Sequence, residues 1–246
     1  MHITVSLTVA ESKRLIAKGL VASRQVQTAR DQGILAVAPG TTNGYVVEEL
    51  LGEAIDKPHF VTGNTLPFGY QGTKPGKSLP DLVFRRGERL EMSAVEAVQE
   101  MGPGDVFIKG VNAINYDLDQ AGVLIGHPTG GTLGAVLGTI VARRIQLIHP
   151  VGLEKSIPGD LTVAAAMQKE ADGMGPTLWV SPGRLFTEIE ALAVLCEVEA
   201  VPIGAGGIGG AEGAVWLLLR GDEPAVEDAR KLLAGLRGEP AFLGPA

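Results

Sequence analysis

A strand, a tight turn and the start of a helix are encoded in Ile34-Leu35-Ala36-Val37-Ala38-Pro39-Gly40-Thr41-Thr42-Asn43-Gly44. Residues 34–38 form an unbroken apolar run, which predicts a short strand that is buried on both faces. A glycine and two threonines follow at once, and Asn43 is a favourable cap for the helix that the apolar residues of 46–51 predict. This order is typical of a parallel sheet covered by helices.

The alternation of strands and helices continues on both sides of this stretch. Apolar residues at every second position of 3–9 predict a strand, and Thr8 with Glu11 predicts a helix that begins near Ala10 and ends near Arg30. Other patterns predict strands at 59–62, 105–110, 122–125 and 145–149, a hairpin at 82–91, and helices at 93–102, 133–144 and 161–170. We therefore expect residues 1–176 to form an α/β domain with a mostly parallel, helix-covered, Rossmann-like sheet.

Residues 177–246 follow a different order of elements. Strands are predicted at 178–181, 198–203 and 214–219, and helices at 185–195 and 224–236. The order βαββα is typical of a ferredoxin-like α+β unit. We therefore expect residues 177–246 to form a second, smaller unit.

Composition excludes several classes of protein. The 246 residues carry a net charge of −7 at pH 7, which argues against a nucleic-acid binder, because such proteins usually display a basic surface. The single cysteine, Cys196, excludes an intramolecular disulfide and a thiolate metal site. We expect a cytoplasmic protein without a bound metal ion.

One uncharged stretch, residues 120–142, has the length of a membrane span. Pro128 and three glycines interrupt it, however, and such a break is tolerated at membrane depth only inside a protein or a cavity. The stretch is better interpreted as a strand, a glycine loop and a helix. Because the chain also opens without a cationic flank and an apolar run, we expect neither a signal peptide nor a contact with membranes.

Two glycine loops open predicted helices, one at 39–44 and one at 126–134. The first turn of a helix presents unpaired N–H groups and the positive end of the helix dipole, which together favour an anion. Threonine hydroxyls in both loops add donors for phosphate or carboxylate oxygens. An ordinary capped turn has the same local pattern, so these loops alone leave both interpretations open.

A third glycine-rich segment, residues 204–213, lies between two predicted strands rather than before a helix. The helix-dipole argument therefore does not apply, and a mobile loop or a ligand lid is the better interpretation. The segment matches neither a dinucleotide-binding fingerprint nor a Walker loop. We expect no cofactor.

Residues 34–64, with Ala38-Pro39-Gly40-Thr41-Thr42 and the later Thr62-Gly63-Asn64, resemble the start of the effector domain of DeoR-type sugar-responsive repressors. Residues 106–155 resemble the second half of the same domain, with Gly110-Val111-Asn112-Ala113-Ile114-Asn115 in place of Gly-x-x-Gly-Ile-Asp, and with Lys155 where that family often has a lysine. The resemblance covers about 130 residues. It implies the fold of the superfamily of glucosamine-phosphate and ribose-phosphate isomerases and CoA transferases.

Two departures from this pattern change what the resemblance implies. Only about 33 residues precede the first loop, so we expect no helix-turn-helix of the kind that the repressors carry. Ribose-phosphate isomerases have Asp-Gly-Ala-Asp where this chain has Lys109-Gly110-Val111-Asn112, and an amide cannot accept a proton as a carboxylate does. The resemblance therefore leaves the catalytic residues unassigned.

The main hypothesis is a site for a phosphorylated sugar or a similar small anionic metabolite at the carboxyl ends of the strands, with isomerase-like proton transfer if the protein is an enzyme. Both loops are expected to converge on one cleft. The predicted ligand-binding residues are Gly40, Thr41, Thr42, Asn43, Asn64, Lys109, Asn112, His127, Thr129, Gly130 and Gly131.

Two alternatives stay open. Glu212, between an alanine and a glycine, is the one residue comparable to the glutamate that forms a CoA thioester in the transferase branch, which would indicate an acyl-CoA transferase or hydrolase. A non-catalytic metabolite sensor or assembly module is the other, because exposed strand edges in the C-terminal unit can pair with further copies. We expect a homo-oligomer.

Overall fold

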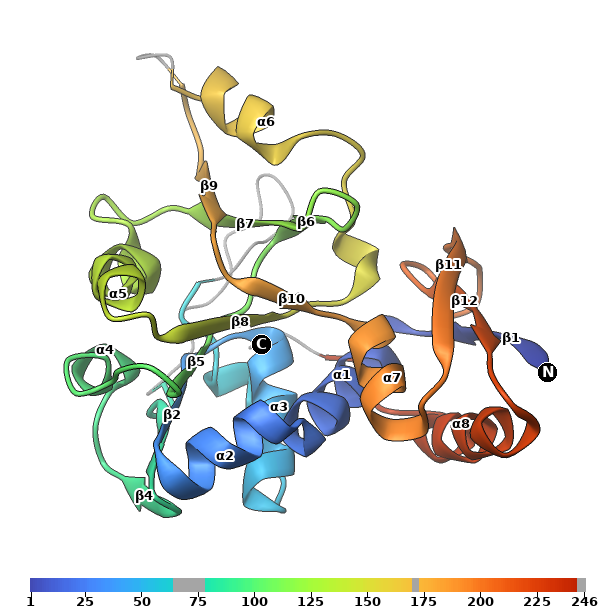
Figure 1. Cartoon of the computed structure of the whole chain (residues 1–246). Coiled ribbons are helices and arrows are strands. Elements are labelled where there is room, and N and C mark those ends of the chain that lie inside the picture. Colours follow the sequence, from blue (N-terminus) through green and yellow to red (C-terminus); the bar gives the residue numbers. More distant parts are fainter. Residues whose placement is uncertain (64–77, 170–172, 243–246) are drawn as a thin grey trace.

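The computed structural model describes residues 1–63, 78–169 and 173–242. Its centre is a six-stranded sheet in the order β10-β8-β5-β2-β3-β4 (Figure 1). The strands are β2 (Ile34–Val37), β3 (Leu82–Arg85), β4 (Glu88–Leu90), β5 (Val106–Ile108), β8 (Gln146–Pro150) and β10 (Arg184–Phe186). The pairs among β2, β5, β8 and β10 are parallel, and those of β3 with β2 and β4 are antiparallel. The predicted α/β class with a mostly parallel sheet is confirmed.

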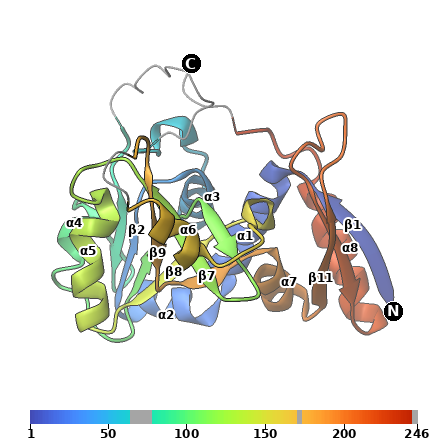
Figure 2. The same ribbon diagram turned by 90° about the horizontal axis from the view of Figure 1, so that it is seen from above.

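Helices cover both faces of this sheet (Figure 2). One face packs against α4 (Ala94–Ala97) and α5 (Gly131–Ala142), and the other packs against α1 (Val9–Ala22), α2 (Arg24–Gln32), α3 (Thr41–Leu51) and α7 (Glu188–Cys196). Val106 and Ile108 of β5 belong to the larger core, whereas Phe107 between them faces α4 and α5. Alternate side chains of one strand therefore serve two separate cores, as burial on both faces requires.

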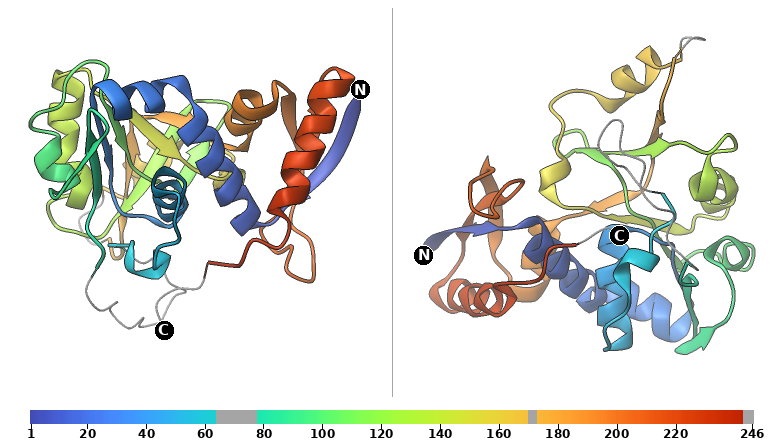
Figure 3. Two further views of the ribbon diagram at one scale, coloured as in Figure 1. Left: turned by 90° about the horizontal axis from the view of Figure 1, so that it is seen from below. Right: turned by 180° about the vertical axis from the view of Figure 1, so that it is seen from behind.

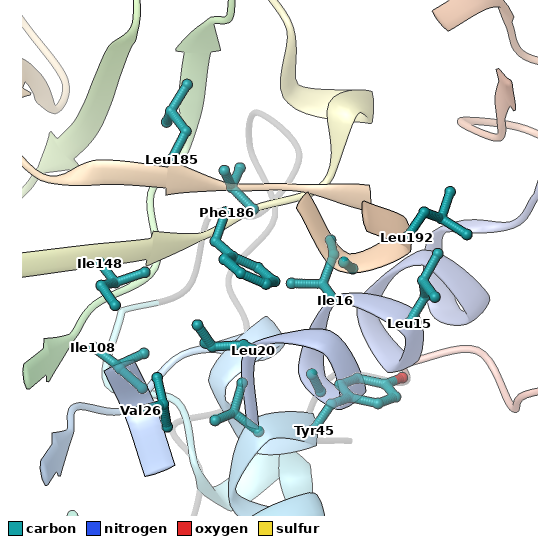
Figure 4. Close-up of a cluster of buried hydrophobic side chains, with 14 of the residues drawn as sticks. Leu15, Ile16, Leu20, Val26, Tyr45, Ile108, Ile148, Leu185, Phe186 and Leu192 are labelled. Atoms are coloured by element: carbon teal, nitrogen blue, oxygen red, sulfur yellow. The ribbon is translucent and has the colours of Figure 1, made fainter. Parts of the chain in front are cut away.

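The larger core joins α1, α3 and α7 to the sheet (Figure 4). Leu15, Ile16 and Leu20 of α1 are fully buried there and lie at helical spacing on one face. Burial of side chains of this size stabilises the fold by about 1.5–3 kcal/mol each. This packing fixes α1 and α7 beside the carboxyl ends of the parallel strands.

Two smaller sheets flank the central one. One consists of β6 (Ala113–Asn115), β7 (Gln120–Ile125) and β9 (Thr177–Ser181), with α6 (Leu161–Met167) packed on it. The other has the order β1-β12-β11, from β1 (His2–Leu7), β11 (Glu199–Ala205) and β12 (Val215–Arg220), and α8 (Glu223–Leu236) lies beside it. Two short 3-10 helices, η1 (Lys57–His59) and η2 (Leu153–Lys155), complete the elements described here.

The strands after residue 176 do not form the βαββα sheet that the sequence predicts. The first of them, β9, pairs with β7, and β10, which sequence reasoning missed, pairs with β8. The N-terminal β1 pairs with β12 along its whole length and takes the place at the edge. The alternating pattern of β1 predicts a strand but contains no information about its partner. The division of the chain at residue 176 into a larger domain and a smaller unit stays a prediction.

Two further local predictions, a helix and a strand, need correction, and a third, a hairpin, is confirmed. The helix expected from about residue 10 to 30 is broken at Ser23, whose backbone is extended and whose hydroxyl donates to the Leu20 carbonyl, an interaction that competes with continuation of the helix. The strand expected at 59–62 is wrong: Lys57–His59 form a 3-10 turn with Pro58 at its start. The hairpin at 82–91 is confirmed, with Arg86 and Gly87 at positive φ in its turn.

The uncharged stretch 120–142 folds as β7, a loop and α5, as predicted. In the part of the chain that the structure describes, no helix has the length and apolar character needed to cross a bilayer.

The chain after α8 runs back across α1 (Figure 3). Arg14 of α1 donates to both carboxylate oxygens of Glu239, at 2.9 and 3.0 Å. The Lys13 ammonium lies 5.6 Å from the centre of the Phe242 ring, which is within cation–π distance. This segment therefore covers part of the first turns of α1.

Gly19 provides a test of the α1–α7 packing. A Cβ atom on Gly19 would lie 2.5 Å from the Ala191 Cα, so that Gly19→Ala must push the two helices apart. We expect it to lower the free energy of unfolding by roughly 1–3 kcal/mol. The matched control is Gly138→Ala in α5, where a Cβ meets no atom within 4 Å and a gain of about 0.5–1 kcal/mol is expected. Urea unfolding measures both, and an equal response of the two variants would contradict the close approach of α1 and α7.

Candidate functional site

The first glycine loop lies where it was predicted, at the carboxyl end of β2, but Asn43 does not cap the helix. The helix α3 already begins at Thr41, with Gly40 at the capping position. Asn43 lies within the first turn and is fully buried; its Nδ2 donates to the Ala38 carbonyl at 2.6 Å. Its Oδ1 is also buried and has no hydrogen-bond partner among the residues described here. A buried acceptor without a donor is costly, and such unpaired groups are rare in native structures.

The segment after β5 faces this asparagine. The Asn43 Oδ1 lies 3.9 Å from the position that a Cβ on Gly110 would occupy. Lys109 precedes Gly110, and both polar groups of its backbone contact β8. Its N–H donates to the Ile148 carbonyl at 3.0 Å, and its own carbonyl contacts the His149 Nδ1. The Lys109 side chain therefore extends from a fixed point at the end of the central strand.

Lys155 comes to the same segment from η2. Its Nζ donates to the Val111 carbonyl at 2.8 Å, while the Lys109 Nζ donates to the Gly110 carbonyl at 3.2 Å. Neither ammonium forms an ion pair with a carboxylate within 4.0 Å in the described part of the chain. Two cations close to each other and poorly hydrated are an arrangement that favours an anion.

This environment lowers the pKa of both lysines. Desolvation by burial lowers the pKa of Lys109 to about 8, and the charge of Lys155 lowers it further in the same direction. Burial also lowers the pKa of Lys155, although the Glu154 carboxylate opposes the change. Strongly shifted pKa values of this kind concentrate at functional sites.

Glu154 places a carboxylate beside Lys155. It folds back over Gly152, where a Cβ would lie 1.8 Å from the Glu154 Oε2, so that only glycine leaves room for it. The same Oε2 is buried and has no hydrogen-bond partner among the described residues. We refer to Asn43, Lys109, Glu154 and Lys155 together as the β5-end site.

Lys13 and Glu188 border the β5-end site from α1 and α7. Lys13 is only 7% exposed, and burial lowers its pKa while Glu154 acts in the opposite direction. Glu188 is fully buried and accepts from the Leu153 N–H at 3.0 Å. Its burial, together with the charge of Glu154, raises the pKa of Glu188 to about 7.

His149 links the β5-end site to the β6–β7–β9 sheet. Its Nε2 lies 2.8 Å from the Ser181 Oγ, and its Nδ1 contacts the Lys109 carbonyl. Burial lowers the pKa of His149 to about 4, so that the ring is neutral at pH 7. In this form Nδ1–H donates to the carbonyl and Nε2 accepts from the serine hydroxyl. Because both side chains are buried, this pair positions Lys109 rather than meeting a ligand itself.

The second glycine loop borders a different pocket. A cavity of about 740 Å³ lies between this loop, β9 and α6, and its lining includes His127, Gly130 and Trp179. Gly130 has φ 84°, and a Cβ there would lie 2.9 Å from the Trp179 ring, so the loop needs glycine at this position. The first loop contributes no residue to this pocket, so the cleft that both loops were expected to share is not formed there.

The remaining predicted residues have other positions. His127 and Thr129 are exposed and interact with each other, at 2.9 Å between Nδ1 and Oγ1, and Gly131 begins α5. Asn112 accepts from the Leu124 N–H at 3.0 Å and thereby joins the segment after β5 to β7. Thr42 is buried and Thr41 is partly exposed at the start of α3. Asn64 lies outside the described residues.

Four residues at or beside the β5-end site are not among the predicted ligand-binding residues: Lys13, Glu154, Lys155 and Glu188. One of them had a usable signal, because Lys13 stands three residues before Ile16 and seven before Leu20, which places it on the buried face of α1. Lys155 was noticed only through the family resemblance. Glu154 and Glu188 have no local signal that distinguishes them from surface glutamates.

Comparison of the chain with models of protein families, with curated proteins and with solved structures found no match. The resemblance to the effector domain of DeoR-type repressors therefore stays a prediction.

The titration of Glu188 gives a test of the buried charges. A pKa raised from 4.5 to about 7 stabilises the fold below pH 4.5, and this contribution is lost as the pH rises through about 7. The lowered pKa of His149 acts in the opposite direction, because its contribution is lost as the pH falls through about 4. The two windows overlap, so a variant is needed to separate them.

We expect Glu188→Gln to gain stability relative to the parent chain as the pH rises from 5 to 8, by up to roughly 3 kcal/mol. The measurement is the difference in unfolding free energy between the two chains, from urea unfolding at several pH values. Use of the difference removes the His149 contribution, which both chains share. A difference that does not change with pH would show that Glu188 is not desolvated.

Proposed function

We propose that this protein binds a small anionic metabolite, of the class of phosphorylated sugars, at the β5-end site. The observation that carries the proposal is the pair Lys109 and Lys155. These are two partly buried ammonium groups that donate to one backbone segment and have no carboxylate partner within 4.0 Å in the described chain. An anion bound between them would restore the charge balance that the fold leaves open.

The place of the site in the sheet supports this proposal. In open α/β sheets, ligands bind outside the carboxyl ends of the strands, at the point where neighbouring connections leave in opposite directions. Here the chain leaves β2 toward β3 on one side, whereas β5 leads to β8 on the other. The β5-end site lies at this point, with the first turn of α3 beside it.

Two acceptors give the site a preference for hydroxyl groups. The Asn43 Oδ1 and the Glu154 Oε2 are both buried without a donor among the described residues, and a sugar hydroxyl can donate to each. A ligand with one strongly anionic group and several hydroxyls matches two cations and two free acceptors. Glu154 also supplies the carboxylate that an isomerase-like proton transfer requires, whereas Lys109-Gly110-Val111-Asn112 contains none.

Thermal unfolding with a panel of phosphate compounds tests the proposal. We expect ribose 5-phosphate, glucosamine 6-phosphate or a related ester to raise the melting temperature by roughly 5 °C at saturation. Lys109→Met and Lys155→Met should each abolish most of the shift, because either change removes a cation from the site.

The matched control is Lys231→Met on α8, whose side chain is 64% exposed and which should keep the full shift. Two results would contradict the proposal. One is the absence of a shift in the parent chain across the whole panel, and the other is an equal loss in Lys231→Met.

An exposed apolar sheet face favours a second property, assembly into homo-oligomers. Val201 and Ile203 of β11 and Trp216 of β12 are 38%, 52% and 39% exposed, and β11 lies at an edge of its sheet. We propose that a second copy of the chain covers this face, which is compatible with metabolite binding elsewhere. Glu212, the residue of the acyl-CoA alternative, lies on the exposed loop before β12 and accepts from the Gly210 N–H of its own loop, so it gains no support.

Light scattering after size exclusion tests the assembly. We expect a mass of at least twice 25.6 kDa for the parent chain and a mass near 25.6 kDa for Ile203→Glu. Val163→Glu on α6 is the control, because Val163 is 57% exposed but lies away from this sheet. A parent chain that stays monomeric at all concentrations would contradict the proposal.

A further inference from the structure

We propose that the Lys109 amine forms an imine with the bound metabolite, which is therefore an aldehyde or ketone that carries an anionic group. This inference rests on the proposed function and narrows its substrate class. It adds a covalent step that binding of an anion alone does not require.

The first support is the way in which Lys109 is held. Its backbone is fixed to β8 through the Ile148 carbonyl and the His149 ring, so the position of its Cα is determined by the central sheet. Among residues 1–63, 78–169 and 173–242, its Nζ has one hydrogen-bond partner, the carbonyl of the next residue, at 3.2 Å. Turning the nitrogen toward a ligand would therefore break one long hydrogen bond among those described.

Lys155 is the natural comparison at the same site. Its Nζ is held more tightly, at 2.8 Å from the Val111 carbonyl, and the Glu154 carboxylate favours its charged form. Lys155 is therefore suited to hold an anionic group as an ammonium. The two lysines differ in role: Lys155 supplies charge and Lys109 supplies a nucleophile.

The environment of Lys109 provides the neutral amine that such a reaction needs. Burial and the charge of Lys155 lower its pKa to about 8, so roughly a tenth of the amine is neutral at pH 7, against fewer than one in a thousand for an ordinary lysine. A lysine that is desolvated and next to another cation is the usual form of an activated amine nucleophile.

The reaction is a condensation without oxidation or reduction. The Nζ lone pair forms a bond to the carbonyl carbon, and the electron pair of the C=O bond moves to oxygen, which takes up a proton. The nitrogen loses its protons as the oxygen leaves as water. One amine and one carbonyl thus give one imine and one water molecule. The Lys155 ammonium can pass a proton to the departing oxygen and regain one from the nitrogen, so that it ends in its starting form.

Reductive trapping tests this step on the intact chain. The protein is incubated with glycolaldehyde phosphate and sodium cyanoborohydride, which reduces an imine to a stable secondary amine, and the adduct is located by peptide mass spectrometry. We expect one predominant adduct, on Lys109, whose rate of formation rises with pH around 8. Inorganic phosphate in excess should slow it, because it occupies the same site.

Three variants separate a reacting amine from a mere charge. Lys109→Arg keeps the cation, so it should retain a melting-temperature shift with glycerol 3-phosphate but lose the adduct completely. Lys155→Met removes the neighbouring cation, and it should move the pH profile of any remaining Lys109 adduct to higher pH. Lys231→Met on α8 should behave as the parent chain.

Two results would overturn the inference. One is an adduct spread over exposed lysines with no preference for Lys109, and the other is an adduct that survives in Lys109→Arg. If glycerol 3-phosphate still raises the melting temperature in either case, anion binding stands and only the imine is excluded. If it does not, the proposed function fails as well.

Discussion

The desolvation of two lysine ammonium groups, those of Lys109 and Lys155, is the physical constraint on which the proposed site depends. Water stabilises a cation far better than a protein interior does, and the cost of removing it is normally recovered by a carboxylate at short distance. Lys109 and Lys155 have only main-chain carbonyls as hydrogen-bond partners in the described chain. The fold therefore maintains a local excess of positive charge on a chain whose net charge is −7. Selection for stability alone does not explain such an arrangement, and the anionic ligand that we propose would balance this charge.

The rest of the structure serves to hold these groups in place. β2, β5 and β8 bring the first loop, Lys109 and His149 to one edge of the sheet, and the neutral His149 ring joins that edge to Ser181 of β9. Helices α1 and α7 meet closely at Gly19 and carry Lys13 and Glu188 to the same region. The carboxylate of Glu154 fits over Gly152 because a glycine has no side chain to occupy that space. Each of these contacts comes from a different part of the chain.

Because these contacts join distant parts of the chain, local sequence patterns predict some of the features of the structure and not others. The apolar run 34–38 and the glycine loop after it predict correctly a buried strand and a helix that follows it, whereas the ligand site at this end of the sheet stays a prediction. The prediction that Asn43 caps the helix was wrong, because its short amide turns back to the Ala38 carbonyl. The pairing of β1 with β12 and the approach of Glu154 to Lys155 are long-range contacts, which local periodicity does not contain. Lys13 differs from these, because its spacing from Ile16 and Leu20 on α1 is a local pattern that is sufficient to predict its burial.

The pKa of the Lys109 amine is the most direct measure of this account. Lysines labelled with ¹³C at Cε can be titrated by NMR, and Lys109→Arg identifies the signal of Lys109. We predict a midpoint near pH 8, which inorganic phosphate raises by stabilising the charged form. A midpoint at the ordinary value of about 10.4, unchanged by phosphate, would show that Lys109 is well solvated and would contradict the account.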